Sequence, residues 1–410
     1  MTGTEPPGRD GLGRTTLIAI GGLGITQVIG WGSTYYLLTV LGGPMGRSLE
    51  LSPAMVSSGL SIMLVLGAVL GPVAGRAMDM NGARSIMALG SAIAAAGLVA
   101  LSFAVGPVSY IAAWLLIGLS APLVLYPAAF TALTQIDPGQ ARRAITFLTL
   151  PGGLASTVFW PLSEWLLTHY DWRAICQFYA ALNLVLCLPL HLAVIRRTDH
   201  AAPAARAAAH GDGLPGEARR LAFLLFAAAL ALNALLVTGI LNQFIDLMRR
   251  LGQTPQNAVL IGMIFGLSQT SARVLELSSG ARMDMLRLGL GVTLGFPAAV
   301  VLLMIAPASL VAGLAFAVVF GACNGLWTIV RGALVLRLFG VKGYGENLGT
   351  VIVAQGLAAA AAPVILAGIL DWLGIAPTMA FAIVVSLLAL VAMALLFRHA
   401  TRHEQPQHPP

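Results

Sequence analysis

The stretch GRAMDMNGAR at residues 75–84 is nearly repeated as GARMDMLRLG at residues 280–289. Asp79 and Asp284 therefore stand 205 residues apart in a chain of 410 residues. Both stretches are short charged segments between long uncharged runs. A segment that recurs at half the chain length predicts two halves of matching layout.

Composition places most of this chain in lipid. Hydrophobic residues make up 58% and charged residues only 10%, with a mean hydropathy of +0.87. A soluble domain usually carries about 25% charged residues. The three cysteines all fall inside apolar runs, which excludes a disulfide framework or a metal cluster. The first apolar run shows no cleavage site after it, so we expect no removable signal peptide.

The apolar runs divide into twelve predicted spans. A bilayer core of about 30 Å requires roughly 20 residues of helix, and only helices satisfy their own backbone groups in hydrocarbon. The spans are 17–41, 54–74, 85–105, 109–133, 144–166, 174–195, 220–245, 255–278, 287–306, 309–335, 347–370 and 377–397. Two long charge-free runs are divided at VGPVS (105–109) and IAPAS (305–309), where Pro and small residues favour a turn. The predicted fold is an all-α membrane protein of two pseudo-symmetric six-helix bundles.

The positions of the basic residues predict the orientation. With both termini in the cytoplasm, 17 of the 23 Lys and Arg residues fall in cytoplasmic segments, as the positive-inside rule requires. The net charge of +7 is therefore explained by topology, and a nucleic-acid surface is not needed. Residues 1–16 are the predicted cytoplasmic N-terminus, 17–195 the first bundle, 196–219 a flexible linker, 220–397 the second bundle and 398–410 a cytoplasmic tail. The usage of 22 Arg against one Lys indicates a bacterial plasma membrane.

The repeated stretch carries a family resemblance. Gly75, Asp79, Gly82 and Arg84 match the spacing of the loop motif G-x-x-x-D-[RK]-x-G-R-[RK], so the chain resembles the major facilitator superfamily. Met80 and Ala83 replace two basic residues of that motif, and the second copy, with Gly280 and Asp284, matches less fully. The resemblance implies a transporter in which these residues form a conformational latch on the cytoplasmic side.

The chemistry of the latch follows from the position of Asp79. A carboxylate at a cytoplasmic helix end can accept hydrogen bonds from a neighbouring helix that starts on the same face. The span entered through KGYGENLG (342–349) is the candidate partner. Gly82 permits a sharp turn, and Arg84 is expected to pair with an acid or a lipid headgroup. Gly67, Gly71 and Gly75 form a smooth stripe that lets helices approach closely. The alternative is a charged loop that only holds topology.

The resemblance also implies a central substrate site lined by spans one, four, seven and ten. The polar and aromatic residues on these spans are the candidates, although aromatic residues can also form an interfacial belt and amides can join helices. They are Gln27, Trp31, Thr34, Tyr35, Tyr126, Asn233, Asn242, Gln243, Asn324, Trp327, Thr328 and Arg331.

Two arginines fall inside predicted spans. A cation at a helix centre costs about 2.5–3.5 kcal/mol on insertion scales unless it is paired or hydrated. Arg273 has Glu276 three residues later on the same helix, which predicts a structural ion pair. Arg331 has no acid within a helical turn and is the candidate contact for an anionic substrate, because guanidinium binds carboxylate and phosphate in bidentate fashion. The alternatives are that Arg331 reaches the cytoplasmic surface or meets Glu276 or Asp284 across helices. Glu276 is also the candidate for proton coupling.

These observations predict a secondary transporter that moves a small organic or inorganic anion by alternating access. We expect it to work as a monomer and without a cofactor. A proton or another ion is expected to be coupled to transport. The stretch 35–53 is faintly similar to the entry of monocarboxylate and oxalate/formate-type porters. The alternative is an exporter of drugs or toxic species on the same fold. A membrane sensor or enzyme is less favoured, because the His, Asp and Cys residues do not converge and no phosphate-binding loop is present.

Overall fold

The computed structural model describes residues 12–195, 213–278 and 283–403. Within these ranges the chain contains no strand, and twelve helical spans are long and apolar enough to cross a membrane. The predicted all-helical membrane fold is therefore confirmed. Gly280, from the second copy of the repeated stretch, and most of the predicted linker lie outside the described residues.

The first half is built from ten helical segments that make six spans. They are α1 (Arg14–Ser33), α2 (Leu37–Ser48), α3 (Pro53–Asn81), α4 (Ala83–Ser102), α5 (Pro107–Val124), α6 (Tyr126–Ile136), α7 (Ala141–Gly153), α8 (Ala155–Leu167), α9 (Trp172–Ala181) and α10 (Leu188–Val194). A 3₁₀ turn at Pro138–Gln140 precedes α7, and a π-helical segment at Leu182–Cys187 joins α9 to α10.

The second half repeats this layout with seven helices. They are α12 (Gly216–Asn242), α13 (Phe244–Arg250), α14 (Pro255–Ser278), α15 (Met285–Ile305), α16 (Leu310–Phe339), α17 (Tyr344–Trp372) and α18 (Ile375–His403). α18 extends into residues that the sequence assigns to the tail, because no Gly or Pro stops it before His403.

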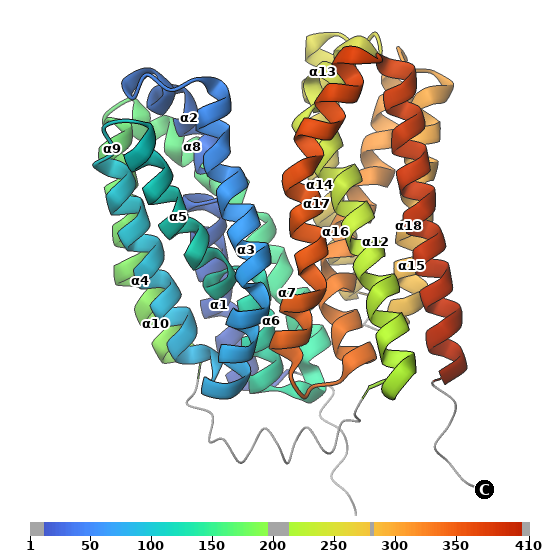
Figure 1. The fold of residues 1–410 in the computed structure, drawn as a ribbon, viewed down its shortest axis with the longest axis horizontal. Coiled ribbons are helices and arrows are strands. Elements are labelled where there is room, and N and C mark those ends of the chain that lie inside the picture. Colours follow the sequence, from blue (N-terminus) through green and yellow to red (C-terminus); the bar gives the residue numbers. More distant parts are fainter. Residues whose placement is uncertain (1–11, 196–212, 279–282, 404–410) are drawn as a thin grey trace, which may run out of the picture.

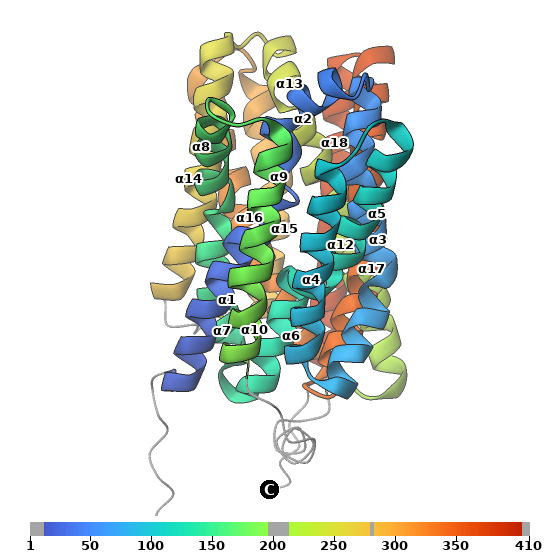
Figure 2. The same cartoon turned by 90° about the vertical axis from the view of Figure 1, so that its left-hand side faces the viewer.

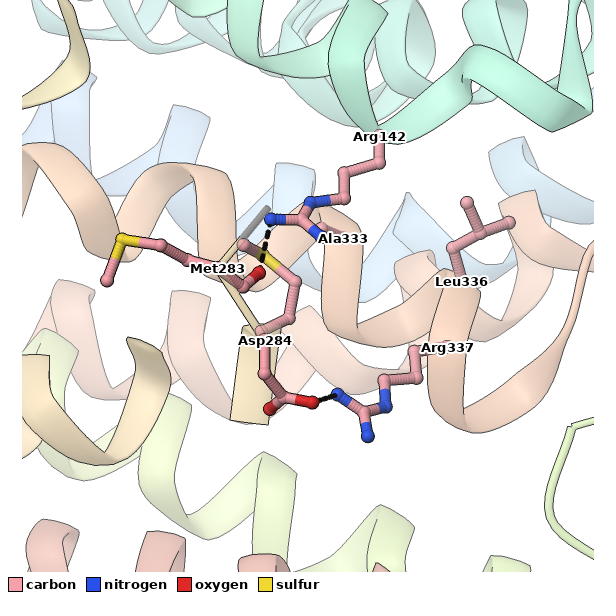
Figure 3. Close-up of a pocket in the computed structure, with 7 residues that line it drawn as sticks. Arg142, Met283, Asp284, Ala333, Leu336 and Arg337 are labelled. Atoms are coloured by element: carbon pink, nitrogen blue, oxygen red, sulfur yellow. Dashed lines mark hydrogen bonds and ion pairs between the residues drawn. The ribbon is translucent and has the colours of Figure 1, made fainter. Parts of the chain in front are cut away.

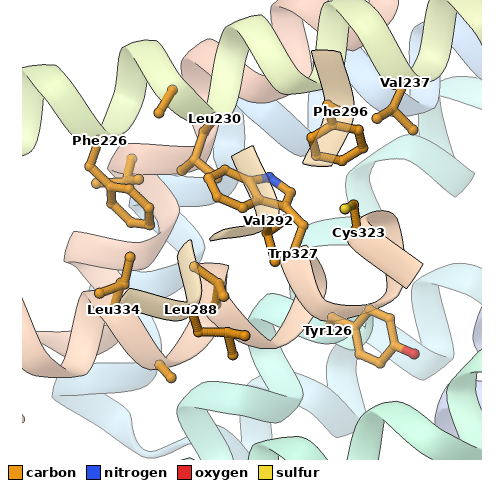
Figure 4. Close-up of a cluster of buried hydrophobic side chains, with 14 of the residues drawn as sticks. Tyr126, Phe226, Leu230, Val237, Leu288, Val292, Phe296, Cys323, Trp327 and Leu334 are labelled. Atoms are coloured by element: carbon orange, nitrogen blue, oxygen red, sulfur yellow. The ribbon is translucent and has the colours of Figure 1, made fainter. Parts of the chain in front are cut away.

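The two halves stand side by side and converge at one end (Figure 1, Figure 2). We call this end the termini face, because α1 begins there and α18 ends there. The contacts between the halves are made by α3 and α6 with α17, and by α7 with α14 and α16. One cluster of buried side chains fills the second half and continues into α6 and α7 of the first (Figure 4).

Several spans that are predicted as continuous helices are broken in the structure. Span one breaks between α1 and α2, span four between α5 and α6, and span five between α7 and α8. Pro and Gly residues near these breaks disfavour a continuous helix. The break after Val124 frees a carbonyl group, and the Gln27 side chain donates a hydrogen bond to it at 2.7 Å. A broken helix is tolerated in a bilayer when other groups satisfy its backbone in this way.

Candidate functional site

Asp79 joins the two halves at the termini face. Its carboxylate accepts hydrogen bonds from the backbone N–H groups of Gly345 at 3.1 Å and Glu346 at 2.8 Å. These two groups lie in the first turn of α17, the helix predicted as the partner of Asp79. The negative side chain thus sits at the positive end of a helix from the other half.

Glycines bring α3 and α17 into backbone contact beside Asp79. A Cβ atom added to Gly75 would lie 2.0 Å from the carbonyl oxygen of Gly345, and one added to Gly71 would lie 3.2 Å from that of Gly349. No side chain fits at Gly75 while the halves are this close. The stripe continues toward the centre, where Gly356 faces Ala68.

The other residues of the first motif have separate roles. Gly82 ends α3 with a φ of 79°, a left-handed conformation that glycine adopts without strain. Arg84 donates to the backbone carbonyl of Leu192 at 2.8 Å, which is not the predicted acid, and pairing with a lipid headgroup stays a prediction. Arg76, which the prediction omits, pairs with Glu346 across the halves. Both side chains are well exposed, so water screens this pair and it contributes little to stability.

The prediction that Asp284 latches the halves is wrong. Asp284 caps its own helix by accepting from the Arg287 N–H at 2.9 Å, and it pairs with Arg337 of α16 (Figure 3). Burial alone would raise the pKa of the Asp284 carboxyl, but these hydrogen bonds outweigh burial and hold the pKa below its ordinary value. All of these partners belong to the second half.

Arg142 of α7 makes the corresponding contact between the halves (Figure 3). It donates to the carbonyl oxygen of Met283 and lies 3.6 Å from a carboxylate oxygen of Glu276. A cavity of about 400 Å³ adjoins this contact and is lined by Arg142, Met283, Asp284, Met285, Ala333, Leu336 and Arg337. From the sequence, Arg142 is only one of the basic residues that predict the orientation of the chain in the membrane.

Arg273 has no carboxylate partner among the described residues, so the predicted ion pair with Glu276 is wrong. Its guanidinium donates to the carbonyl of Gly325 at 3.2 Å and to the carbonyl of Thr149 at 3.0 Å. It also donates to the Gln269 amide and the Thr328 hydroxyl, at 3.3 and 3.4 Å. Thr149 belongs to α7, so this buried cation also bridges the halves.

Arg331 lies near Arg273 at the same interface. Tyr126 of α6, Tyr344 of α17 and Arg273 surround it within electrostatic range. Within the described part of the chain it forms no hydrogen bond or ion pair, and it is partly exposed although it lies roughly 12 Å inside the end of α16. Asn324 and Thr328 are partly exposed on the same face of α16.

Aromatic rings complete this group. Trp31 lies 5.3 Å from Tyr35 and 5.3 Å from Tyr126 between ring centroids. The Tyr126 hydroxyl donates to the carbonyl of Thr149 at 3.4 Å, the same oxygen that Arg273 binds. We call the set Trp31, Tyr35, Tyr126, Arg273, Thr328 and Arg331 the central site.

The remaining predicted site residues lie outside the central site, and several of them bond to backbone carbonyls. Trp327 packs in the core of the second half beside Leu230 and Val292 (Figure 4). Asn242 and Gln243 stand where α12 ends, far from the termini face. Gln27, Thr34 and Asn233 are buried and bond to backbone carbonyls of Val124, Gly30 and Ala229.

Thr149, Tyr36 and Arg142 are missing from the predicted set. Tyr36 resembles an interfacial tyrosine in sequence, yet its ring lies 5.0 Å from that of Tyr35 and its hydroxyl lies within electrostatic range of Arg273. Thr149 acts through its backbone carbonyl, which any residue carries, so no sequence signal identifies it. The Arg142–Arg143 pair before span five is the one signal available for Arg142.

A family model described as Major Facilitator Superfamily matches residues 23–312. Over 159 residues the chain is 27% identical to an uncharacterized 38 kDa protein of Thermoproteus tenax encoded in its 23S RNA operon. That match covers 39% of this chain and 42% of the relative, so it spans less than half of the relative's length.

Solved structures share the fold along nearly the whole chain. The human organic anion transporter MFSD10 is 18% identical with a TM-score of 0.67, covering 96% of this chain and 100% of its own. The proton:xylose symporter XylE is 15% identical with a TM-score of 0.69, covering 94% of each chain. The Escherichia coli fucose:proton symporter FucP is 13% identical with a TM-score of 0.65, covering 96% and 100%. At these identities the likeness concerns the fold alone.

Proposed function

Because the chain belongs to the major facilitator superfamily, we propose that it is a secondary transporter that moves a small anion across a membrane by alternating access. The negative charge of the substrate is inferred from the guanidinium groups of Arg273 and Arg331, which both lie at the interface of the halves. Neither has a carboxylate partner within the described residues. A bound anion would offset part or all of this positive charge.

The membrane is proposed to be a bacterial plasma membrane, with the termini face in the cytoplasm. The excess of basic residues in the segments at that face supports this orientation. The described conformation is then closed on the cytoplasmic side by Asp79, the glycine stripe and Arg142. A substrate would reach the central site from the other side of the membrane.

Glu276 is our candidate for proton coupling. Its side chain is fully buried in α14, one turn from Arg273 and next to Arg142 of the other half. Protonation of Glu276 would weaken its attraction for Arg142 and so loosen a contact between the halves. The organic anion named for MFSD10 and the protons named for XylE and FucP are properties of those proteins, and they support this proposal by fold only.

Uptake by proteoliposomes tests the anion assignment. We expect the purified protein to transport carboxylate or oxyanion tracers, and we expect Arg331→Gln to reduce uptake by at least about tenfold, because a hydrogen bond to a charged group contributes about 1.5–3 kcal/mol. Arg249→Gln removes a charge at the exposed opposite face and should leave uptake unchanged. Transport of only neutral or cationic solutes, or full anion uptake by the Arg331 variant, would contradict the proposal.

A further inference from the structure

Six aromatic rings of the first half form a continuous ladder that leads to the central site. Trp160 of α8 lies 5.9 Å from Tyr36, and Tyr36 lies 5.0 Å from Tyr35. The ladder continues through Trp31 and Tyr126 in steps of 5.3 Å and ends at Phe130, also 5.3 Å from Tyr126. The break between α1 and α2 places Tyr35 and Tyr36, and the break before α6 places Tyr126.

Exposure along the ladder is graded. Trp160 is 42% exposed, while Trp31, Tyr35 and Tyr36 are partly exposed. Tyr126 is 6% exposed and Phe130 is fully buried. A row covered throughout by the protein core would show no such gradient. The graded row instead offers ring surface from the outer end of the ladder to the interface between the halves.

The inner part of the ladder lies beside the cations. The hydroxyls of Tyr36 and Tyr126 are within electrostatic range of Arg273, and that of Tyr126 is also within range of Arg331. The indole N–H of Trp31 is buried and has no hydrogen-bond partner among the described residues. One place therefore combines flat apolar surface, a spare donor and two uncompensated positive charges.

We infer that the anion taken by this site is an aromatic carboxylate, an inference that rests on the proposed function. Its ring would stack on the ladder, where aromatic pairs are favoured at centroid distances of roughly 4.5–7 Å. Its carboxylate would face Arg331 and Arg273. A sulfate or phosphate ion fits less well, because oxygen atoms turned toward the rings would lose their hydration without gaining hydrogen bonds.

Binding measurements on the unchanged, full-length protein test this inference directly. Dissociation constants for benzoate, acetate, sulfate and phosphate would be measured by thermal stabilisation of the purified protein. We expect benzoate to bind at least about tenfold more tightly than acetate, as an extra buried ring requires. Benzyl alcohol, which has the ring without the charge, should not stabilise the protein. Acetate, sulfate or phosphate binding as tightly as benzoate would overturn the inference.

Single substitutions then show which ring gives the preference for benzoate over acetate. Trp31→Leu should remove most of the preference for benzoate over acetate, whereas Trp31→Phe, which keeps a ring, should retain most of it. Trp372→Leu is the matched control, because Trp372 is 88% exposed at the far end of α17. An unchanged preference in Trp31→Leu would also overturn the inference. If none of the four anions binds the unchanged protein, the proposed function itself fails.

Discussion

A guanidinium group stays charged at physiological pH, so each arginine inside a bilayer needs stabilising surroundings. Arg273 donates four hydrogen bonds, to two carbonyls, an amide oxygen and a hydroxyl, which occupy four of its five N–H groups but leave its charge uncompensated. Arg250 shows the contrast, because it pairs with both Asp246 and Asp371 at the opposite face. We propose that the charge of the inner arginines serves a ligand, whereas the outer arginine is already neutralised by two carboxylates.

The hydrogen-bond partner of Arg273 could not be predicted from the sequence. Spacing along one helix favours Glu276, three residues away, as its partner. The structure instead gives it Thr149, 124 residues away in the other half. A backbone carbonyl on a distant helix carries no side-chain signal, so the contact depends on how the halves dock. Asp79 was predictable because its acceptor role needs only a nearby helix start.

Removing the charge of Asp79 is expected to loosen the termini face. Asp79→Asn weakens the attraction to the positive end of α17, which is worth about 1 kcal/mol or roughly a fivefold change in an equilibrium. The measurement is the maleimide labelling rate of a cysteine placed at Thr131, which lies beside Gly345, in a background without the three buried cysteines. The labelling rate should rise about fivefold.

Asp171→Asn is the control for this measurement. Asp171 also caps a helix start, accepting from the Ala174 N–H at 2.9 Å, but both residues belong to the first half. It should leave the labelling rate at Thr131 unchanged. Equal labelling in the Asp79 variant and the unchanged protein would show that Asp79 does not hold the halves together.

At the scale of elements, α3 and α17 form the contact that closes the termini face. They run antiparallel, so Gly71 meets Gly349 and Gly75 meets Gly345, and both pairs touch through backbone atoms. The Arg76–Glu346 pair is exposed, so water screens its attraction strongly. Shape is therefore the larger determinant here, because overpacking such a contact costs about 1–3 kcal/mol.

Sequence predicted the glycine stripe but not the broken helices. Regular spacing shows that Gly71 and Gly75 share a face, and close packing follows from their size. A proline such as Pro151 only favours a break. Whether the helix actually parts depends on partners for the freed groups, such as Gln27 for the carbonyl of Val124, which come from another helix.

A methyl group at Gly75 is expected to separate the two helices. In Gly75→Ala the new Cβ would overlap the carbonyl oxygen of Gly345, so the closed arrangement loses about 1–3 kcal/mol relative to one in which α3 and α17 part. Labelling at Thr131 should therefore rise by at least about fivefold. Gly368→Ala, on α17 with no neighbouring atom within 4 Å, should have no effect. If both variants label alike, the close approach does not limit opening.

At the scale of the whole molecule, polar contacts between the described parts of the two halves gather toward the termini face. Among the described residues, Asp79, Arg76, Arg142 and Arg273 make hydrogen bonds or ion pairs across the interface, and all four lie toward the termini face. Twelve spans and two matching halves could be predicted from hydropathy and the repeated stretch, because both are local signals. Which half-to-half contacts form depends on the conformational state, which sequence does not encode locally.

Alternating access requires these contacts to break in every transport cycle. A short bifunctional thiol reagent that joins cysteines at Arg76 and Glu346 would hold α3 against α17 and keep the termini face closed. We expect this crosslink to abolish uptake by proteoliposomes, because the substrate could no longer leave on that side. Binding of the substrate from the opposite face should persist, because the central site needs no opening of the latch to be reached from there.

The pair Arg250 and Asp371 provides the matched control for the crosslink. They form an exposed ion pair of the same kind, but both belong to the second half, so joining them restrains no movement between halves. Uptake should survive that crosslink and disappear only with the one at 76 and 346. If quantitative crosslinking at 76 and 346 left uptake intact, the substrate would have a route that does not involve parting of α3 and α17. The two halves would then be a static scaffold, and alternating access about this interface would have to be abandoned.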